Sequence, residues 1–146
     1  MKALFYLATI FLGIVLAVHL AMNGQVGATL KNARVANALF WCIGALGATV
    51  IGATGWEPGA LNGLKYINPL LLVAGIMGAC LVFAIAWLIP REGAAAVMIM
   101  LIAGQVLGGM VLSHFGWLGS PVQRVSLTNL AGAAVMIVGV LLATRA

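Results

Sequence analysis

Four side chains carry the chemistry that this sequence can perform: His19, Asn23, Trp41 and Gln105. His19 and Asn23 are four residues apart, so they share one face of a helix. All four lie in or beside long apolar runs, where an unpaired polar group costs several kcal/mol. An imidazole, two amides and an indole can hydrogen-bond to a small organic solute and stack on it. These residues are therefore the candidate solute-binding residues.

Two of these residues keep more than one interpretation. Gln105 can line a cavity, or it can form a hydrogen bond between helices, which is the common use of a buried amide in membranes. His19 can be a satisfied histidine near the membrane interface, or it can carry protons, because histidine changes charge between about pH 5 and 8. His114 is expected in a loop.

Catalytic and cofactor patterns are missing from the chain. Its only carboxylates, Glu57 and Glu92, fall in predicted loops, so no buried acid can exchange a cation for protons. There is no paired carboxylate, no nucleophile placed with a base and no phosphate-binding glycine loop, since the Gly-Gln-Val-Gly segment at 24–27 is too short. Cys42 and Cys80 lack metal-ligand spacing. The sequence predicts a protein that is not an enzyme and uses no metal or cofactor.

The elements that hold these side chains are membrane-spanning helices. The chain is 64% hydrophobic and 6% charged, with a mean hydropathy of +1.20, and about 20 apolar helical residues cross a bilayer core. We expect an all-α integral membrane protein, a single five-helix transmembrane domain over residues 1–146. The expected spans are 3–22, 34–54, 69–88, 93–113 and 127–144.

The segments between the spans are short, and two of them contain helix-end signals. Asn68 is placed to cap a helix that Pro69 opens, and residues 89–93 predict a tight reversal around Pro90. The first span resembles a secretory signal, but its apolar run is longer than a typical signal core and four more spans follow. We therefore expect it to stay as a membrane helix.

Basic residues are divided almost evenly between the two predicted membrane faces. Such a chain has no excess of Lys and Arg to fix its orientation, so it can insert both ways up and form an antiparallel pair. The residues sit singly at helix ends rather than in a cluster, which disfavours nucleic acid as a partner. One face carries Lys2, Lys65 and Arg124, and the other carries Lys31, Arg34, Arg91 and Arg145.

Small residues recur every four positions in two spans. Gly44, Ala48 and Gly52 line one face of the second span, and Gly104 and Gly108 line one face of the fourth. Such stripes allow close contact between helices. The stripes alone leave open whether that contact lies within one chain or between two chains.

Two groups of motifs resemble the YdcZ-type proteins, which are small bacterial membrane proteins, mostly of five helices, in the drug/metabolite transporter superfamily. The first group is Val-His-Leu-Ala-Met-Asn-Gly-Gln-Val-Gly at 18–27, with Ala-Asn-Ala-Leu-Phe-Trp at 36–41 and Gly44. The second is Pro-Arg-Glu-Gly-Ala-Ala at 90–95, with Gly-Gln at 104–105 and His-Phe-Gly-Trp-Leu-Gly at 114–119.

The resemblance implies a bacterial inner-membrane protein related to the small multidrug resistance exporters, in a family that includes dual-topology homodimers. Asn23 and Gln105 match polar positions of that family. His19 stands where relatives usually carry Gln, and His114 where many carry Asp.

The sequence thus predicts half of a small transporter that works as a dimer by alternating access. Its partners would be the lipid bilayer, a small-molecule substrate, and either a second antiparallel copy or an oppositely oriented homologue. A pocket without fixed negative charge favours a neutral, zwitterionic or anionic solute over a simple cation. The alternative is a non-transporting membrane subunit that stabilises or regulates a partner protein. A narrow channel is less supported, because no charged ring or filter is present.

Overall fold

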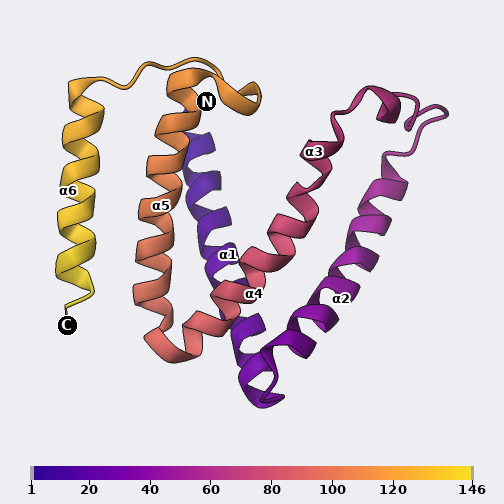
Figure 1. Ribbon diagram of the computed structural model, residues 1–146, viewed down its shortest axis with the longest axis horizontal. Coiled ribbons are helices and arrows are strands. Elements are labelled where there is room, and N and C mark those ends of the chain that lie inside the picture. The colour runs from indigo at the N-terminus through magenta and orange to yellow at the C-terminus, as the bar shows by residue number, and fades with distance from the viewer. Residues whose placement is uncertain (1, 146) are drawn as a thin grey trace. The chain divides into compact units, whose positions relative to one another are not determined.

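The computed structural model describes residues 2–145, and every regular element in that part of the chain is a helix. The chain divides into two compact units, one that ends at Arg91 and one that begins at Glu92. The first unit contains three long helices, and the second contains two (Figure 1). The elements are α1 (Lys2–Thr29), α2 (Ala33–Thr54), η1 (Leu64–Tyr66), α3 (Pro69–Leu72), α4 (Ala74–Glu92), α5 (Ala94–Phe115), η2 (Trp117–Gly119) and α6 (Leu127–Ala143).

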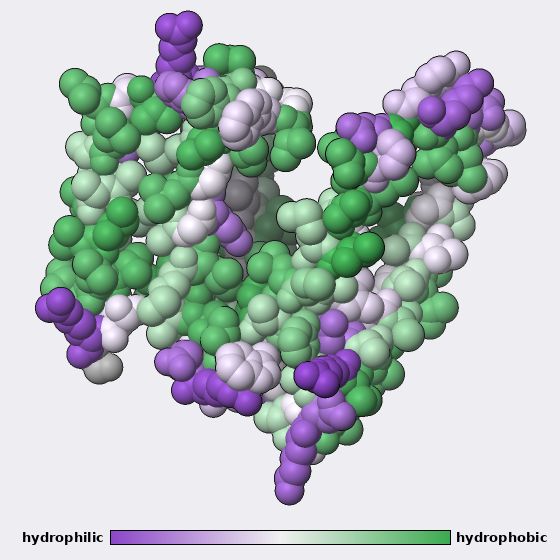
Figure 2. Space-filling model, viewed as in Figure 1, coloured by the Kyte–Doolittle hydropathy of each residue, from purple (hydrophilic) through white to green (hydrophobic). Residues whose placement is uncertain are grey.

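Within the described residues, four stretches of helix are long and apolar enough to cross a membrane: Leu4–Thr29, Ala33–Thr54, Pro69–Glu92 and Ala94–Phe115. The fifth helix, Leu127–Ala143, has 17 residues, or about 26 Å at 1.5 Å per residue. It therefore stands at the lower limit for a spanning helix. In each unit the helices present hydrophobic side chains along their length, while hydrophilic residues gather at the helix ends (Figure 2). The expectation of an all-α membrane protein is confirmed.

Helix α1 extends past the predicted end of the first span. We expected a loop over residues 23–33, but α1 continues to Thr29 and only residues 30–32 form the turn before α2. No proline interrupts this stretch. It contains two glycines, and the close packing that they allow offsets their cost in helix stability. A side chain at Gly24 would meet the carbonyl oxygen of Ala86 at 3.4 Å, and one at Gly27 would meet the Cα atom of Ala33 at 3.4 Å.

The turn after α1 is a Schellman motif with a lysine in the position that usually holds glycine. The Asn32 N–H donates to the Gly27 carbonyl and the Lys31 N–H donates to the Ala28 carbonyl, both at 3.1 Å. Lys31 has a φ of 51°, a left-handed conformation that costs a side-chain-bearing residue about 1–2 kcal/mol. Its positive charge beside the α1 C-terminus recovers about 0.3–1 kcal/mol.

The break between α4 and α5 is a single residue, Gly93, and does not lie at the proline. We expected Pro90 to lie in a tight turn, but α4 includes it and continues to Glu92. Pro90 is in the last turn of the helix, where its ring disturbs little beyond the carbonyl of Ala86, which loses its helical partner. The chain turns at Gly93, whose φ of 83° suits glycine.

The core of the first unit lies where α1, α2 and α4 approach one another. Helices α1 and α2 are in direct contact, and Gly24 brings α4 against α1. A side chain at Gly78 would meet the Trp41 ring at 3.4 Å, which brings α4 against α2. The buried apolar side chains of this unit are Leu20, Ala36, Ile85 and Ala86.

In the second unit, α5 packs against α6. The segment that connects them is held against the end of α5. Helix α5 includes His114, which we expected in a loop, and ends at Gly116 with a left-handed φ of 67°. The His114 Nδ1 atom accepts a hydrogen bond from the Val125 N–H at 3.1 Å. Ser126 and Asn129 then form a capping box at the start of α6. His114 therefore has a structural role in holding the loop.

Candidate functional site

The first unit contains an apolar groove between α1 and α2, with a volume of about 430 Å³. It includes His19 and Asn23, the pair that the sequence places one helical turn apart. Their helix continues through both residues, so both point from one face of α1 toward α2. The groove is lined by Ile14, Val15, Val18, His19, Met22, Asn23, Val26, Ala36, Leu39, Phe40 and Ile43.

His19 is held against an aromatic ring of the opposite helix. Its imidazole lies 4.7 Å from the ring of Phe40, centroid to centroid, at an interplanar angle of 54°. The histidine is half-buried. This contact fixes the ring at the α1–α2 junction, where it can meet a solute that enters the groove.

Among residues 4–145, Asn23 is the one polar residue that is almost completely buried. Its exposed fraction is 4%, and its side-chain Nδ2 atom has no hydrogen-bond partner among residues 2–145. A buried donor without a partner costs about 1–3 kcal/mol. The amide N–H is therefore an unused donor beside the groove, and it can meet an acceptor atom there once the side chain turns, because the Nδ2 atom itself is closed to solvent.

A second amide of the first unit, Asn37 of α2, was not among the predicted site residues. Its Nδ2 atom donates to the Ala79 carbonyl of α4 at 3.3 Å, while its Oδ1 atom is buried without a partner. The available signal was an amide inside an apolar span and inside one of the quoted motifs. Asn37 joins α2 to α4 and leaves one acceptor unused.

Trp41 lies outside the groove, although we expected it beside His19 and Asn23. Its ring packs against Gly78 of α4 and meets Phe40 edge-on, with ring centroids 5.8 Å apart. The reason is helical periodicity, because Trp41 follows Phe40 by one residue and points about 100° away from it. Its role in solute binding remains a prediction.

Gln105 belongs to the second unit, on α5. Its side chain is exposed within the described chain. The neighbouring polar groups serve the loop: the Ser113 and Ser120 hydroxyls are 3.1 Å apart, and the Ser113 carbonyl accepts from the Gln123 N–H at 2.8 Å. The predicted binding role of Gln105 remains a prediction.

No carboxylate lines the groove. Glu92 ends α4, and Glu57 lies in the segment between α2 and α3. Within residues 2–145, no three His, Cys, Asp or Glu side chains come close enough to hold a metal ion. The groove therefore combines apolar surface with one imidazole and one amide, whose N–H is unpaired but buried.

The small-residue stripes are not used for packing within their own units. No atom of the first unit lies within 4 Å of a side chain built at Gly44 or Gly52, and none of the second unit lies within 4 Å of one at Gly104 or Gly108. Within each unit these faces are open, and lipid, the other unit or another chain can cover them. Any close helix contact at these stripes therefore involves atoms outside their own unit.

Comparison with known proteins places the chain in a family. The family model described as "Putative inner membrane exporter, YdcZ" matches residues 4–142, nearly the whole chain. No curated protein and no solved structure matches it. The family that the motifs at 18–27 and 90–95 indicated is confirmed. The chain belongs to the YdcZ family of exporters, and it is therefore a multi-pass inner-membrane protein of the transporter class.

Proposed function

We propose that this protein moves a small organic solute across the membrane by alternating access, as one half of a dimeric transporter, and that the α1–α2 groove is part of its binding site. The observation that carries the proposal is Asn23, a nearly buried amide whose N–H has no partner and which lines an apolar groove. Membership of an exporter family supplies the functional class. A ligand acceptor atom would complete the missing hydrogen bond.

The lining of the groove supports a proposal for the chemical class of the solute. Its lining is apolar apart from His19 and Asn23, so the solute carries an apolar body with one hydrogen-bond acceptor, such as a carbonyl or a carboxylate. No negative side chain is present to neutralise a cation. A neutral, zwitterionic or anionic solute is therefore favoured over a simple cation.

The proposal includes a second chain. Three long helices in one unit and two in the other are few to enclose a path for a solute, and transporters commonly build that path between two related halves. The open faces at Gly44, Gly52, Gly104 and Gly108 would accept close helix contacts from a partner. The near-equal division of basic residues favours an antiparallel copy, or an oppositely oriented homologue, as that partner.

Transport by purified protein in proteoliposomes tests the function. We expect saturable uptake of at least one neutral, zwitterionic or anionic metabolite from a panel preselected by thermal stabilisation of the protein. Asn23→Ala should abolish that uptake. The matched control is Gln25→Ala, which removes an exposed amide from the same helix outside the groove. A protein that transports nothing, but stabilises a co-purified membrane protein, would instead be a non-transporting subunit.

Labelling of single cysteines at positions 59 and 145, in chains that lack Cys42 and Cys80, tests the orientation. Each site should react from both sides of the membrane. Replacing Lys31 and Arg34 with alanine should bias insertion toward one orientation and remove activity until an oppositely biased chain is co-expressed. Reaction of each site from one side only would contradict dual topology.

A further inference from the structure

A second pocket in the first unit concentrates positive charge. It has a volume of about 660 Å³ and lies where α1 ends, α2 begins and α4 completes its last turns. Three cationic side chains reach it from segments about 60 residues apart in the sequence. The lining residues are Gly27, Ala28, Lys31, Asn32, Ala33, Arg34, Phe83, Ala86, Trp87, Pro90 and Arg91.

This pocket corrects the expectation that basic residues sit singly at helix ends. Lys31 and Arg34 flank the α1–α2 turn, and the packing of α4 against α1 brings Arg91 to the same pocket. The chain has two acidic residues, Glu57 and Glu92, and neither lines the pocket. The three positive charges therefore have no protein counter-ion among the lining side chains.

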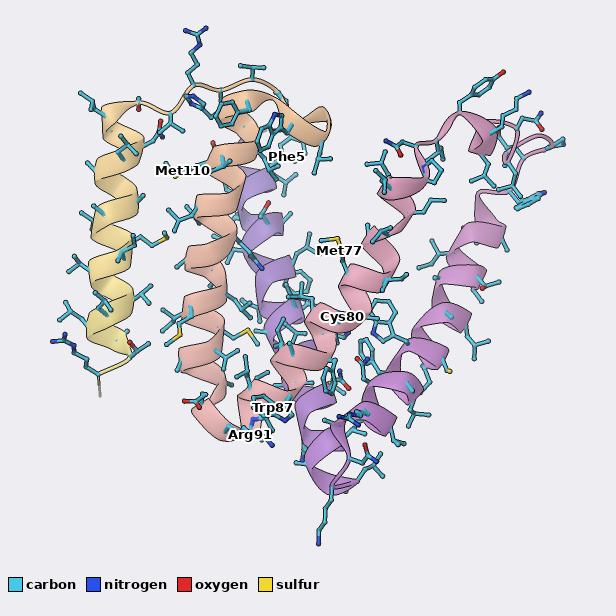
Figure 3. The ribbon with its side chains drawn as sticks, viewed as in Figure 1. Phe5, Met77, Cys80, Trp87, Arg91 and Met110 are labelled. Carbon is cyan, nitrogen blue, oxygen red and sulfur yellow. The ribbon has the colours of Figure 1, made fainter. Side chains whose placement is uncertain are left out.

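Arg91 is held in place by Trp87, one helical turn before it. The guanidinium carbon lies 3.8 Å from the centroid of the Trp87 ring, and Nη1 donates to the Trp87 carbonyl oxygen at 2.5 Å. Both side chains lie on the last turns of α4 (Figure 3). Such stacking leaves the other guanidinium N–H groups free, and their planar fork matches the oxygens of a phosphate.

The walls of the pocket change from polar to apolar. Phe83, Ala86 and Pro90 add apolar surface on α4, while Lys31, Asn32 and Arg34 supply polar groups at the turn. The pocket also lies at the ends of apolar spanning helices, where a bilayer places its headgroups. Basic pockets at this depth between membrane helices suit anionic headgroups.

We propose that the pocket formed by Lys31, Arg34 and Arg91 binds a phosphate-bearing anion. Two sources supply this chemistry at a membrane surface, the phosphodiester of an anionic lipid headgroup and a soluble phosphate. The site is separate from the α1–α2 groove, and it stands whether or not that groove carries a solute.

The test uses quenching of Trp87 fluorescence by brominated lipids in reconstituted vesicles, with Trp41, Trp56 and Trp117 replaced by phenylalanine. Vesicles contain phosphatidylcholine with either brominated phosphatidylglycerol or brominated phosphatidylcholine. We expect stronger quenching by the anionic lipid. Lys31→Gly and Arg34→Gln should each reduce the preference about fivefold, the worth of one basic residue at an anionic surface.

Arg91→Lys separates a built site from a general positive field. The variant keeps the positive charge but removes the planar guanidinium and its stacking on Trp87. If the pocket binds through this geometry, the preference for the anionic lipid should fall. If only the positive charge matters, the preference should not change. Inorganic phosphate, added against chloride of equal ionic strength, identifies the source. Reversal of quenching indicates a soluble phosphate, and persistence indicates the lipid headgroup.

Native mass spectrometry of the unaltered chain repeats the comparison without tryptophan substitutions, by counting retained phosphatidylglycerol against phosphatidylcholine. Equal quenching and equal retention of the two lipids, with no effect of phosphate on the quenching, would overturn the proposal. An unchanged lipid preference in Arg91→Lys would overturn the proposal that this pocket is a specific binding site.

Discussion

Replacing Asn23 with alanine should make the protein more stable while it abolishes transport. The structure buries the Asn23 amide with its N–H unpaired, which costs the folded state about 1–3 kcal/mol. Alanine removes that penalty, and it also gains up to about 0.7 kcal/mol in helix propensity over asparagine. The space it leaves opens into the groove rather than into a closed core. We expect a net gain in unfolding free energy of about 1–2 kcal/mol.

Reversible unfolding in mixed micelles, followed by circular dichroism, measures this gain. Gln25→Ala is the control, because an exposed substitution on the same helix should stay within about 0.5 kcal/mol of the original chain. The ligand supplies a second measurement. A solute at 100 times its dissociation constant should stabilise the original chain by about 2.7 kcal/mol and the Asn23→Ala chain far less.

The opposite sign of the stability change would refute the reasoning. Breaking a hydrogen bond between membrane helices costs about 0.6 kcal/mol on average. A loss of that size in Asn23→Ala would mean that the amide has a structural partner in the assembled protein. Unchanged solute stabilisation in the variant would remove Asn23 from the binding site.

Three further predictions follow from the other polar and charged residues. Gln105→Leu should abolish uptake while the protein stays folded, as seen by size-exclusion chromatography; unchanged uptake kinetics would remove Gln105 from the site. His19→Gln should preserve solute binding but remove the effect of a proton gradient on uptake, and an original chain whose uptake ignores the gradient would show no coupling through His19. At Lys31, glycine should give a higher unfolding free energy than alanine by about 1 kcal/mol, because both remove the charge and only glycine relaxes the left-handed backbone. Equal stability of those two variants would contradict that backbone account.

Local signals in the sequence predicted the elements well. Hydrophobic run length identified the spanning helices, because a bilayer sets the number of apolar residues that a helix needs. The cap at Asn68 formed as expected, with its side chain accepting from the Leu70 N–H at 3.0 Å. Helix ends were less predictable where glycine or proline is involved. Gly24, Gly27 and Pro90 all lie inside helices, since packing or a terminal position offsets their cost.

The sequence also predicted some of the residues of the candidate site. His19 and Asn23 share a groove because a helix places residues four apart on one face, which is a local property. The sequence alone also determined that no carboxylate could serve in the groove, since the chain has only Glu57 and Glu92. These features need no knowledge of which helices are neighbours.

Only the tertiary structure decided which polar atoms lack partners and which distant residues meet. The contact of the Trp41 ring with Gly78 and the presence of Lys31 and Arg91 in one pocket depend on how α4 packs against α1 and α2. That packing is set by close approach at Gly24 and Gly78, and its direction is not encoded in any single helix. Because hydrophobic periodicity is weak in helices that are apolar all round, their facing sides become defined only when the helices come together.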